Sequence, residues 1–294
     1  MKPPPFEYYA PTTVEEAVAH LAEHGYDAKP LAGGQSLIPM MNFRLAQPAI
    51  LVDLNNIAEL SFIRPEDDGG LSIGAMTRHQ MVEKDAQVVE RAPLINETMP
   101  KIATSQIRSR GTFGGSLAHA DPSAELVAVS VALDGNFKVV GPQGERWVPA
   151  NEFFLGLFTS VLEPEELLVE INLPPFPERT GWSLMEIARR PHDFCLIGVV
   201  AVLTLDEKDQ CQQAKLVYLS AGDGPVEAHQ AAELLKGQAL TAEAIQAAAE
   251  TAASADIDPS SDIHATAEFR RHLANVLARR ALGEALERAI SNTQ

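Results

Sequence analysis

The sequence predicts an α+β protein built in two parts, and three observations lead to this fold class. Helix-like and strand-like patterns alternate over residues 12–54, which is typical of a small α/β unit. A proline-rich stretch, "LPPFPERTG" at 173–181, separates the first part from the second. Beyond it, apolar strand-like runs precede an alanine-rich helical region that begins near residue 226, the order of an antiparallel sheet followed by helices.

The first α/β unit begins with a capped helix. In "TTVEEAVAHLAEHG" (12–25), Thr13 and Glu16 have the spacing of a capping box, and Gly25 provides the helix end. The apolar face of this helix consists of Val14, Ala17, Val18 and Leu21. A strand, a helix and a buried strand are expected at 28–32, 36–45 and 49–54.

A second unit begins with the strand pattern "LSIGA" at 71–75, and Thr77 is expected to cap the helix that follows. A helical pattern covers roughly 87–106, interrupted by Pro93 and Pro100. Asp121, followed by Pro122, is a helix entry for "AELVAVSVAL". Further strands are expected at "FKVVG" and "ELLVEINLP". The second part of the chain adds the strands "WSLMEIA", "CLIGVVAVLTL" and "AKLVYLSAG" and a long helix at 267–290.

Composition narrows the classes of function. The 294 residues carry a formal charge of −17, which disfavours binding to nucleic acid or to an anionic membrane. An anionic ligand would have to be held by local dipoles, such as backbone N–H groups at helix N-termini. No apolar run is long enough to cross a bilayer, and "MKPPPFEYY" has no signal-peptide core, so we expect no membrane insertion and a cytoplasmic location. Two cysteines are too few for an iron–sulfur cluster within this chain.

Two glycine-rich stretches have the composition of phosphate-binding loops. The first, Gly33-Gly34-Gln35-Ser36, lies between a predicted strand and a predicted helix, where glycines let the backbone approach a ligand. On its own it is equally consistent with a plain strand-to-helix turn. The second, Thr112-Phe113-Gly114-Gly115-Ser116, repeats the pattern of two glycines beside hydroxyls. Neither matches GxGxxG or GK[ST], so together they favour a dinucleotide whose diphosphate is held from both sides without a Rossmann fingerprint. Neither stretch contains lysine.

Other polar motifs are less specific. Asp121 and Glu125 have the side chains to accept hydrogen bonds from ribose or adenine, although Asp121 also suits helix capping. "QIRSRGT" (106–112) and "ARRPHDF" (188–194) carry paired arginines that either face a ligand or partner or belong to solvated loops. No Ser–His–Asp order, paired carboxylates or HExxH motif indicates a hydrolase or a metal site.

The segments "PLAGGQSLIPMMNFRLAQP" and "QIRSRGTFGGSLAHADPSAE" resemble the two FAD-binding signatures of the medium, flavoprotein subunit of molybdenum hydroxylases. Relatives in this family include aerobic carbon monoxide dehydrogenase and the FAD domain of xanthine dehydrogenase. The resemblance implies a PCMH-type FAD-binding domain at 1–176, with α/β subdomains at about 1–57 and 58–176. A C-terminal domain at 177–294, with a small antiparallel sheet and a helical bundle, is then expected.

The resemblance also implies which residues contact FAD. The two glycine-rich stretches would hold the diphosphate, Glu125 would contact the adenosine half, and Leu168 and Phe194 would lie near the flavin. Gln35 and Ser116 depart from the histidine and asparagine of relatives. The full set of implied FAD-binding residues is Leu31, Ala32, Gly33, Gly34, Gln35, Ser36, Leu37, Thr112, Gly114, Gly115, Ser116, Glu125, Leu168 and Phe194.

The family function implied for the chain is electron transfer through FAD. A large molybdenum-binding subunit with a molybdenum–pterin cofactor and a small subunit with [2Fe–2S] clusters would be its partners, in a dimer of heterotrimers. FAD would take electrons from a cluster and pass them to an external acceptor. Two alternatives remain open from the residues: a self-sufficient FAD-dependent oxidoreductase acting on a small molecule, and a non-catalytic nucleotide-binding module.

Overall fold

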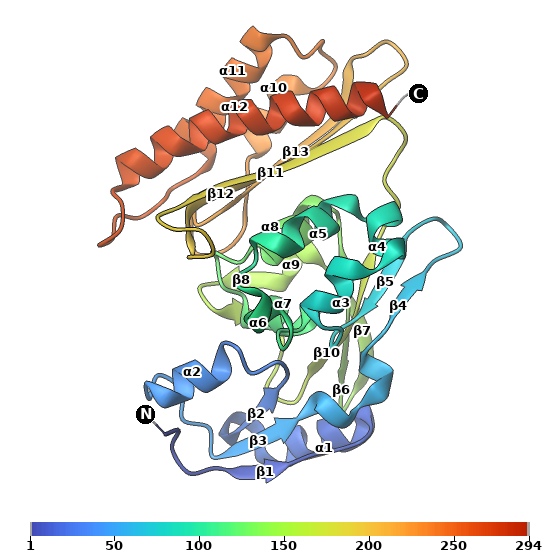
Figure 1. Ribbon diagram of the computed structural model, residues 1–294, viewed down its shortest axis with the longest axis vertical. Helices are drawn as coiled ribbons and strands as arrows, with labels where there is room; N and C mark the ends of the chain where they lie inside the picture. Colours follow the sequence, from blue (N-terminus) through green and yellow to red (C-terminus); the bar gives the residue numbers. More distant parts are fainter. Residues whose placement is uncertain (1, 293–294) are drawn as a thin grey trace. The chain divides into compact units, whose positions relative to one another are not determined.

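The computed structural model describes residues 2–292, and the chain divides into two compact units (Figure 1). The first unit runs to His119 and also contains Gly135–Leu155 and Thr159–Pro174. The second contains Ala120–Asp134, Gly156–Phe158 and the chain from Pro175 onward. Residues 120–134 therefore pack with the second unit although they precede the proline-rich stretch. No helix among the described residues has the length and apolar character needed to span a membrane.

A three-stranded parallel sheet opens the first unit, in the order β1 (Glu7–Tyr9), β3 (Ile50–Asp53) and β2 (Ala28–Leu31). Helix α1 (Val14–His24) connects β1 to β2 and packs the predicted apolar face onto the sheet. Thr13 caps this helix by accepting a hydrogen bond from the N–H of Glu16. Since the strands are parallel, the segments that follow β2 and β3 emerge at the same edge of the sheet.

A five-stranded antiparallel sheet forms the rest of the first unit, in the order β4–β5–β10–β6–β7. Its strands are β4 (Ile63–Pro65), β5 (Leu71–Gly74), β6 (Asn136–Gly141), β7 (Gly144–Pro149) and β10 (Leu167–Leu173). The helices between and beside the strands are α2 (Leu37–Asn42), α3 (His79–Lys84), α4 (Ala86–Arg91), α5 (Pro93–Thr98), α6 (Ser105–Arg108), α7 (Phe113–His119) and α9 (Ala150–Phe153). The short elements are η1 (Gly25–Asp27), η2 (Leu54–Asn56), η3 (Ala58–Leu60), η4 (Met99–Lys101), β8 (Phe154–Gly156) and β9 (Thr159–Ser160).

The second unit is a four-stranded antiparallel sheet with helices on it, which confirms the predicted α+β class. Its strands, in sheet order, are β11 (Thr180–Ala188), β12 (Cys195–Leu205), β13 (Cys211–Leu219) and β14 (Val226–Glu227). Its helical elements are α8 (Glu125–Ala132), α10 (His229–Leu235), α11 (Ala242–Thr251), η5 (Ala252–Asp256) and α12 (Ala267–Ser291). The odd-numbered residues of β12 from Ile197 to Leu205 join the core with α10, α11 and α12, while α8 also packs on β12 and β13.

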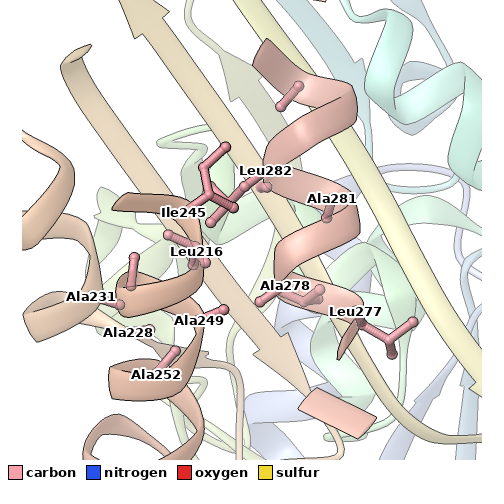
Figure 2. Packing of buried hydrophobic residues seen from close by; sticks show 14 of the residues in the cluster. Leu216, Ala228, Ala231, Ile245, Ala249, Ala252, Leu277, Ala278, Ala281 and Leu282 are labelled. Carbon is pink, nitrogen blue, oxygen red and sulfur yellow. The ribbon is translucent and has the colours of Figure 1, made fainter. Parts of the chain in front are cut away.

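Alanines allow the helices of the second unit to lie close to its sheet. Figure 2 shows Ala278, Ala281 and Leu282 of α12 beside Leu216 of β13 and the alanines of neighbouring helices. The closest approach is at Gly181 of β11, where a β-carbon would lie 2.5 Å from the backbone nitrogen of Ala289. Small side chains therefore set the distance between α12 and the sheet. The long helix predicted at 267–290 is confirmed as α12.

One local prediction was wrong, and the predicted capping box was confirmed only in its Thr13 half. Thr77 does not cap a helix, because Arg78 precedes α3 and the Thr77 hydroxyl is buried. That hydroxyl accepts a hydrogen bond from the N–H of Phe62 (3.1 Å) and donates one to the Phe62 carbonyl (2.8 Å). The Glu16 carboxylate reaches the N–H of Thr12 (2.8 Å), one residue further back than a capping box requires. In both cases a neighbouring backbone group was the better partner.

Candidate functional site

The first glycine loop, defined as Ala32–Ser36, connects β2 to α2 at the edge where β3 also ends. Gly34 has a φ of +73°, the left-handed conformation that glycine adopts without strain. Among the described residues, the backbone N–H groups of residues 34–37 donate no hydrogen bond. The hydroxyl of Ser36 is exposed and makes no capping bond. The loop therefore presents consecutive donors, the arrangement that binds an anion.

The first glycine loop borders a pocket of about 350 Å³ that lies within the first unit. Arg110 also lines this pocket, and its exposed side chain pairs with no acidic group in the part of the chain that the structure describes. A formal positive charge therefore stands beside the loop, in addition to the dipoles expected from the sequence. The lining residues are Leu31, Ala32, Gly33, Gly34, Gln35, Ile38, Pro39, Asn42, Asp53, Asn55 and Arg110.

Gly33 brings the first glycine loop against the segment that precedes the second glycine-rich stretch. A β-carbon at Gly33 would lie 2.8 Å from Cα of Gly111, and it would also collide with the carbonyl oxygen of Arg110. The structure thus requires glycine here for contact between two parts of the protein. The side chain of Gln35 stays within the loop and donates to the carbonyl of Gly33 at 2.9 Å.

The second glycine segment, defined as Thr112–Ser116, is not an open loop, because α7 begins at Phe113. The backbone N–H groups of residues 113–116 are already bonded within the protein. Phe113 donates to Thr77 O (3.0 Å), Gly114 to Ala75 O (2.9 Å), Gly115 to Thr112 Oγ1 (3.2 Å) and Ser116 to Thr112 O (3.1 Å). The pattern of hydroxyls and glycines therefore forms a capped first turn of a helix.

Close packing explains the glycines of the second glycine segment. A β-carbon at Gly114 would lie 2.8 Å from Cα of Ala75, at the end of β5, and 2.9 Å from its carbonyl oxygen. Thr112 is 2% exposed. What this segment still presents is the half-buried hydroxyl of Ser116, which has no capping role. Its contribution to ligand binding would come from side chains rather than from backbone N–H groups.

His79 of α3 forms a hydrogen bond to the start of the second glycine segment. Its Nε2 lies 2.9 Å from the carbonyl oxygen of Thr112, so this nitrogen carries the proton and donates. The side chain is 4% exposed, and burial lowers its pKa from 6.5 to about 4. The imidazole is therefore neutral in the folded protein over the physiological pH range.

A polar network that the sequence reasoning missed supports the first glycine loop. Asn55 donates to the carbonyl of Ala32 (3.0 Å) and to the carboxylate of Asp53, which also accepts a hydrogen bond from the Tyr8 hydroxyl. Arg78 donates to Asn55 Oδ1 and to the carbonyl of Arg110. The available signal was "LVDLNN", in which an acid and an amide follow a strand predicted next to the loop. The network ties the loop after β2 to the loop after β3.

Of the remaining sequence-predicted residues, Leu37 directly follows the first glycine loop, and the others lie elsewhere in the chain. Leu37 is the first residue of α2, and Leu168 is buried on β10 in the first unit. Glu125 is the first residue of α8, and Phe194, 77% exposed, directly precedes β12; both belong to the second unit. Of the two arginines in "QIRSRGT", Arg108 is structural, since it pairs with Glu83 at 2.9 Å and caps two carbonyls.

The donors of the pocket fit a diphosphate. Gly34 and Gln35 line the pocket, and the N–H groups of residues 34–37 have no acceptor among the described residues. Together with the Ser36 hydroxyl beside the pocket and the Arg110 guanidinium that lines it, they offer hydrogen bonds and positive charge to phosphate oxygens. The acidic side chain that lines the same pocket, Asp53, is engaged by Tyr8 and Asn55. FAD carries such a diphosphate, so the residues present are compatible with this cofactor.

Comparison with known proteins agrees with this fit. Residues 4–176 match the model of the FAD binding domain in molybdopterin dehydrogenase, and residues 182–285 match the CO dehydrogenase flavoprotein C-terminal domain. The 6-hydroxypseudooxynicotine dehydrogenase complex subunit alpha of Paenarthrobacter nicotinovorans is 39% identical over 289 residues, 98% of this chain and 97% of that protein. The carbon monoxide dehydrogenase medium chain of Hydrogenophaga pseudoflava is 40% identical over 288 residues, 98% and 99% of the two chains.

A solved structure gives the same result for the fold. A chain of carbon monoxide dehydrogenase from Hydrogenophaga pseudoflava, in a form that lacks the Mo-pyranopterin moiety of the molybdenum cofactor, superposes with a TM-score of 0.95. It is 40% identical in sequence, and the match covers 98% of this chain and 99% of that one. The two domain matches and the relatives along the whole chain show that this protein belongs to the family of FAD-binding medium subunits of molybdenum hydroxylases, the flavoprotein components of these oxidoreductases.

Proposed function

We propose that this chain is the FAD-carrying electron outlet of a cytoplasmic molybdenum hydroxylase. It would receive electrons from a [2Fe–2S] cluster on a small partner subunit and deliver them to an external acceptor. A large subunit with the molybdenum–pterin cofactor would carry out the hydroxylation, in a dimer of heterotrimers. The observation that carries the proposal is the run of N–H donors at residues 34–37, which have no acceptor among the described residues and which begin in a pocket that Arg110 also lines.

The chain's own residues would bind and orient the cofactor. The N–H groups of residues 34–37 and the Ser36 hydroxyl would donate to the diphosphate, and Arg110 would offset its charge within a chain of net charge −17. Asn55, held by Asp53 and Arg78, would keep the loop in place through the Ala32 carbonyl. When bound, FAD supplies one- and two-electron redox chemistry.

Further contacts are proposed from the family resemblance. Glu125 would serve the adenosine half, and Leu168 and Phe194 the flavin. The second glycine segment would contribute the Ser116 hydroxyl, while Thr112, Gly114 and Gly115 would give the segment its shape. The remaining residues of the expected set, Leu31 and Leu37, flank the first glycine loop.

The cysteines support an electron source outside this chain. An ordinary [2Fe–2S] cluster takes four cysteine thiolates, and the sequence has two cysteines. Cys195 and Cys211 are both buried, and burial raises the pKa of the Cys195 thiol to about 12 and that of Cys211 to about 11. Two buried thiols cannot supply the four ligands of such a cluster, so we assign the clusters to a partner.

The relatives support a substrate site on another subunit. Chains from 6-hydroxypseudooxynicotine dehydrogenase and carbon monoxide dehydrogenase are 39% and 40% identical to this one. The substrates in those two names share no chemistry, although the two chains resemble this one equally. Equal similarity to subunits of enzymes with unrelated substrates is expected if the flavoprotein subunit does not bind the substrate.

The test is the visible spectrum and metal content of the natively purified chain with the proteins that co-purify. We expect flavin absorption from this chain, and molybdenum and iron on two further polypeptides. FAD on an isolated chain that turns over a small molecule would contradict the proposal and favour a self-sufficient flavoenzyme. A colourless chain that takes up no added FAD would contradict any flavin-dependent function.

A further inference from the structure

Two histidines and a glutamate of α1 come together away from the pocket described above. His20, Glu23 and His24 stand at positions i, i+3 and i+4 of the helix and so share one face. A ligand atom from each lies within 4.8 Å of the other two. Residues 20–24 read H-x-x-E-H, the inverted order of the HExxH zinc motif. None of the three residues lines the pocket beside the first glycine loop.

Tyr9 of β1 orders both imidazoles of this cluster. Its ring stacks on His20 with centroids 4.3 Å apart and an interplanar angle of 23°. It also stacks on His24 at 5.7 Å and 19°. Because both rings lie against one aromatic surface, their orientations are restricted before a ligand binds, which lowers the entropic cost of binding.

The Nε2 atom of His24 is buried and lacks a hydrogen-bond partner among the described residues. The nearest carboxylate oxygen, Oε2 of Glu23, is 3.8 Å away, and the Glu23 side chain is 70% exposed and free to change rotamer. A buried polar atom that forms no hydrogen bond destabilises the folded protein. An ion bound between this nitrogen and the carboxylate would satisfy both groups.

The surroundings of the cluster favour a cation. Glu7 accepts a hydrogen bond from the Tyr9 hydroxyl at 3.3 Å, and Glu16 lies one helical turn before His20. Glu23 adds a third acidic group, and the whole chain has a charge of −17. The local field therefore attracts positive ions to a place where two imidazole side chains can bind them.

We propose that His20, Glu23 and His24 form a binding site for a divalent transition-metal ion, with zinc as the fitting ion. Two imidazoles and one carboxylate suit zinc, whereas calcium and magnesium prefer oxygen ligands alone. Zinc–ligand bonds of about 2.0–2.2 Å bring tetrahedral ligands to about 3.5 Å from one another, so the site closes by about 1 Å. Rotation of the exposed Glu23 side chain supplies this movement. Three protein ligands leave a position for water or for a side chain of another molecule.

The test is a zinc titration of the full-length chain after treatment with a chelator, with a chromophoric chelator as competitor. We expect one tight zinc per chain, and an affinity lower by about 100-fold in His20→Gln and in His24→Gln because each loses a ligand. His272→Gln is the matched control, since His272 is an exposed helical histidine outside the cluster. Equal zinc affinity in all four proteins, or no binding by the unaltered chain, would overturn the proposal.

A second measurement on the unaltered chain does not depend on the folding of a variant. With ¹⁵N-labelled histidine, zinc should move the imidazole resonances of His20 and His24 and leave that of His272 in place. Zinc binding that leaves the His20 and His24 resonances unmoved would place the ion elsewhere and refute the site. FAD affinity should be the same with and without zinc, because the two sites share no residue.

Discussion

The two glycine-rich stretches of the first unit have similar sequences but opposite hydrogen-bonding states. In the first glycine loop and the start of α2, the N–H groups of residues 34–37 find no acceptor among the described residues. In the second glycine segment, the N–H groups of residues 113–116 are all bonded to Thr77, Ala75 and Thr112. One stretch presents donors on a pocket, and the other uses its donors to fix α7 against β5.

The difference shows what a glycine pair does and does not indicate. In both stretches glycine permits a close approach of backbone, by Gly33 to Gly111 and by Gly114 to Ala75. The approach in each case is to another part of the protein. Whether such a stretch also binds an anion depends on where its N–H groups are used, and that is decided by tertiary structure.

The largest effect is expected from Gly114→Val. The side chain would enter the backbone of Ala75, so the free energy of unfolding should fall by about 3 kcal/mol or more, with loss of FAD as a consequence. Thermal unfolding of the chain measures this. Gly156→Val is the control, because a β-carbon at Gly156 meets nothing within 4 Å. A Gly114→Val protein as stable as this control would show that the segment is not packed as described.

Acid should loosen the second glycine segment through His79. Burial lowers the pKa of His79 from 6.5 to about 4, so the unfolded chain takes up a proton between these values and the folded chain does not. Stability is therefore full above pH 6.5 and falls as the pH decreases to about 4. A pKa difference of about 2.5, at about 1.4 kcal/mol each, amounts to about 3 kcal/mol. Urea unfolding across this pH range should give a flatter curve for His79→Gln; parallel curves would contradict the assignment.

Much of the fold was predictable because its signals are local. Thr13 and Gly25 mark the two ends of α1 within fourteen residues of sequence, and the apolar run 195–205 is the central strand of the second unit. The α7 helix was missed because "FGGSLAH" has low helix propensity. Glycine is required at residue 114 because the backbone there packs against Ala75, which is far away in sequence. Local sequence patterns do not contain such contacts.

The candidate site was predicted in part for the same reason. Residues 31–36 were identified because strand, glycines and helix are adjacent in sequence. Asn55, Arg78 and Arg110 were not assigned to this site, since they reach the loop from three separate segments. Their grouping follows from parallel pairing of β2 with β3 and from the bridge between Arg78 and Thr112.

Arg110→Gln should separate ligand affinity from stability. Loss of a charged hydrogen bond costs about 1.5–3 kcal/mol, so FAD affinity should fall by about 10- to 100-fold. The melting temperature of the FAD-free chain should not change, because the side chain is exposed. Arg279→Gln, an exposed arginine of α12, is the matched control. An FAD affinity equal to that of the control would remove Arg110 from the site.

The smallest effects should come from a pair of hydroxyl removals. Ser36→Ala should weaken FAD binding by about two- to tenfold and leave stability unchanged, since the hydroxyl has no capping bond. Thr112→Val removes the acceptor for the Gly115 N–H and should lower stability by about 1 kcal/mol. Fluorescence titration with FAD and thermal unfolding distinguish the two. If Ser36→Ala instead lowered stability and Thr112→Val instead weakened FAD binding, the roles assigned to the two stretches would be wrong.

Amide hydrogen exchange of the chain, first stripped of FAD and then reloaded, tests the difference between the two stretches most directly. Residues 34–37 should exchange fast without FAD and slowly with it, because the diphosphate becomes their acceptor. Residues 113–116 should be protected in both states by Thr77, Ala75 and Thr112. Unchanged exchange at residues 34–37 after FAD has bound would contradict the assignment of the first glycine loop as the diphosphate site.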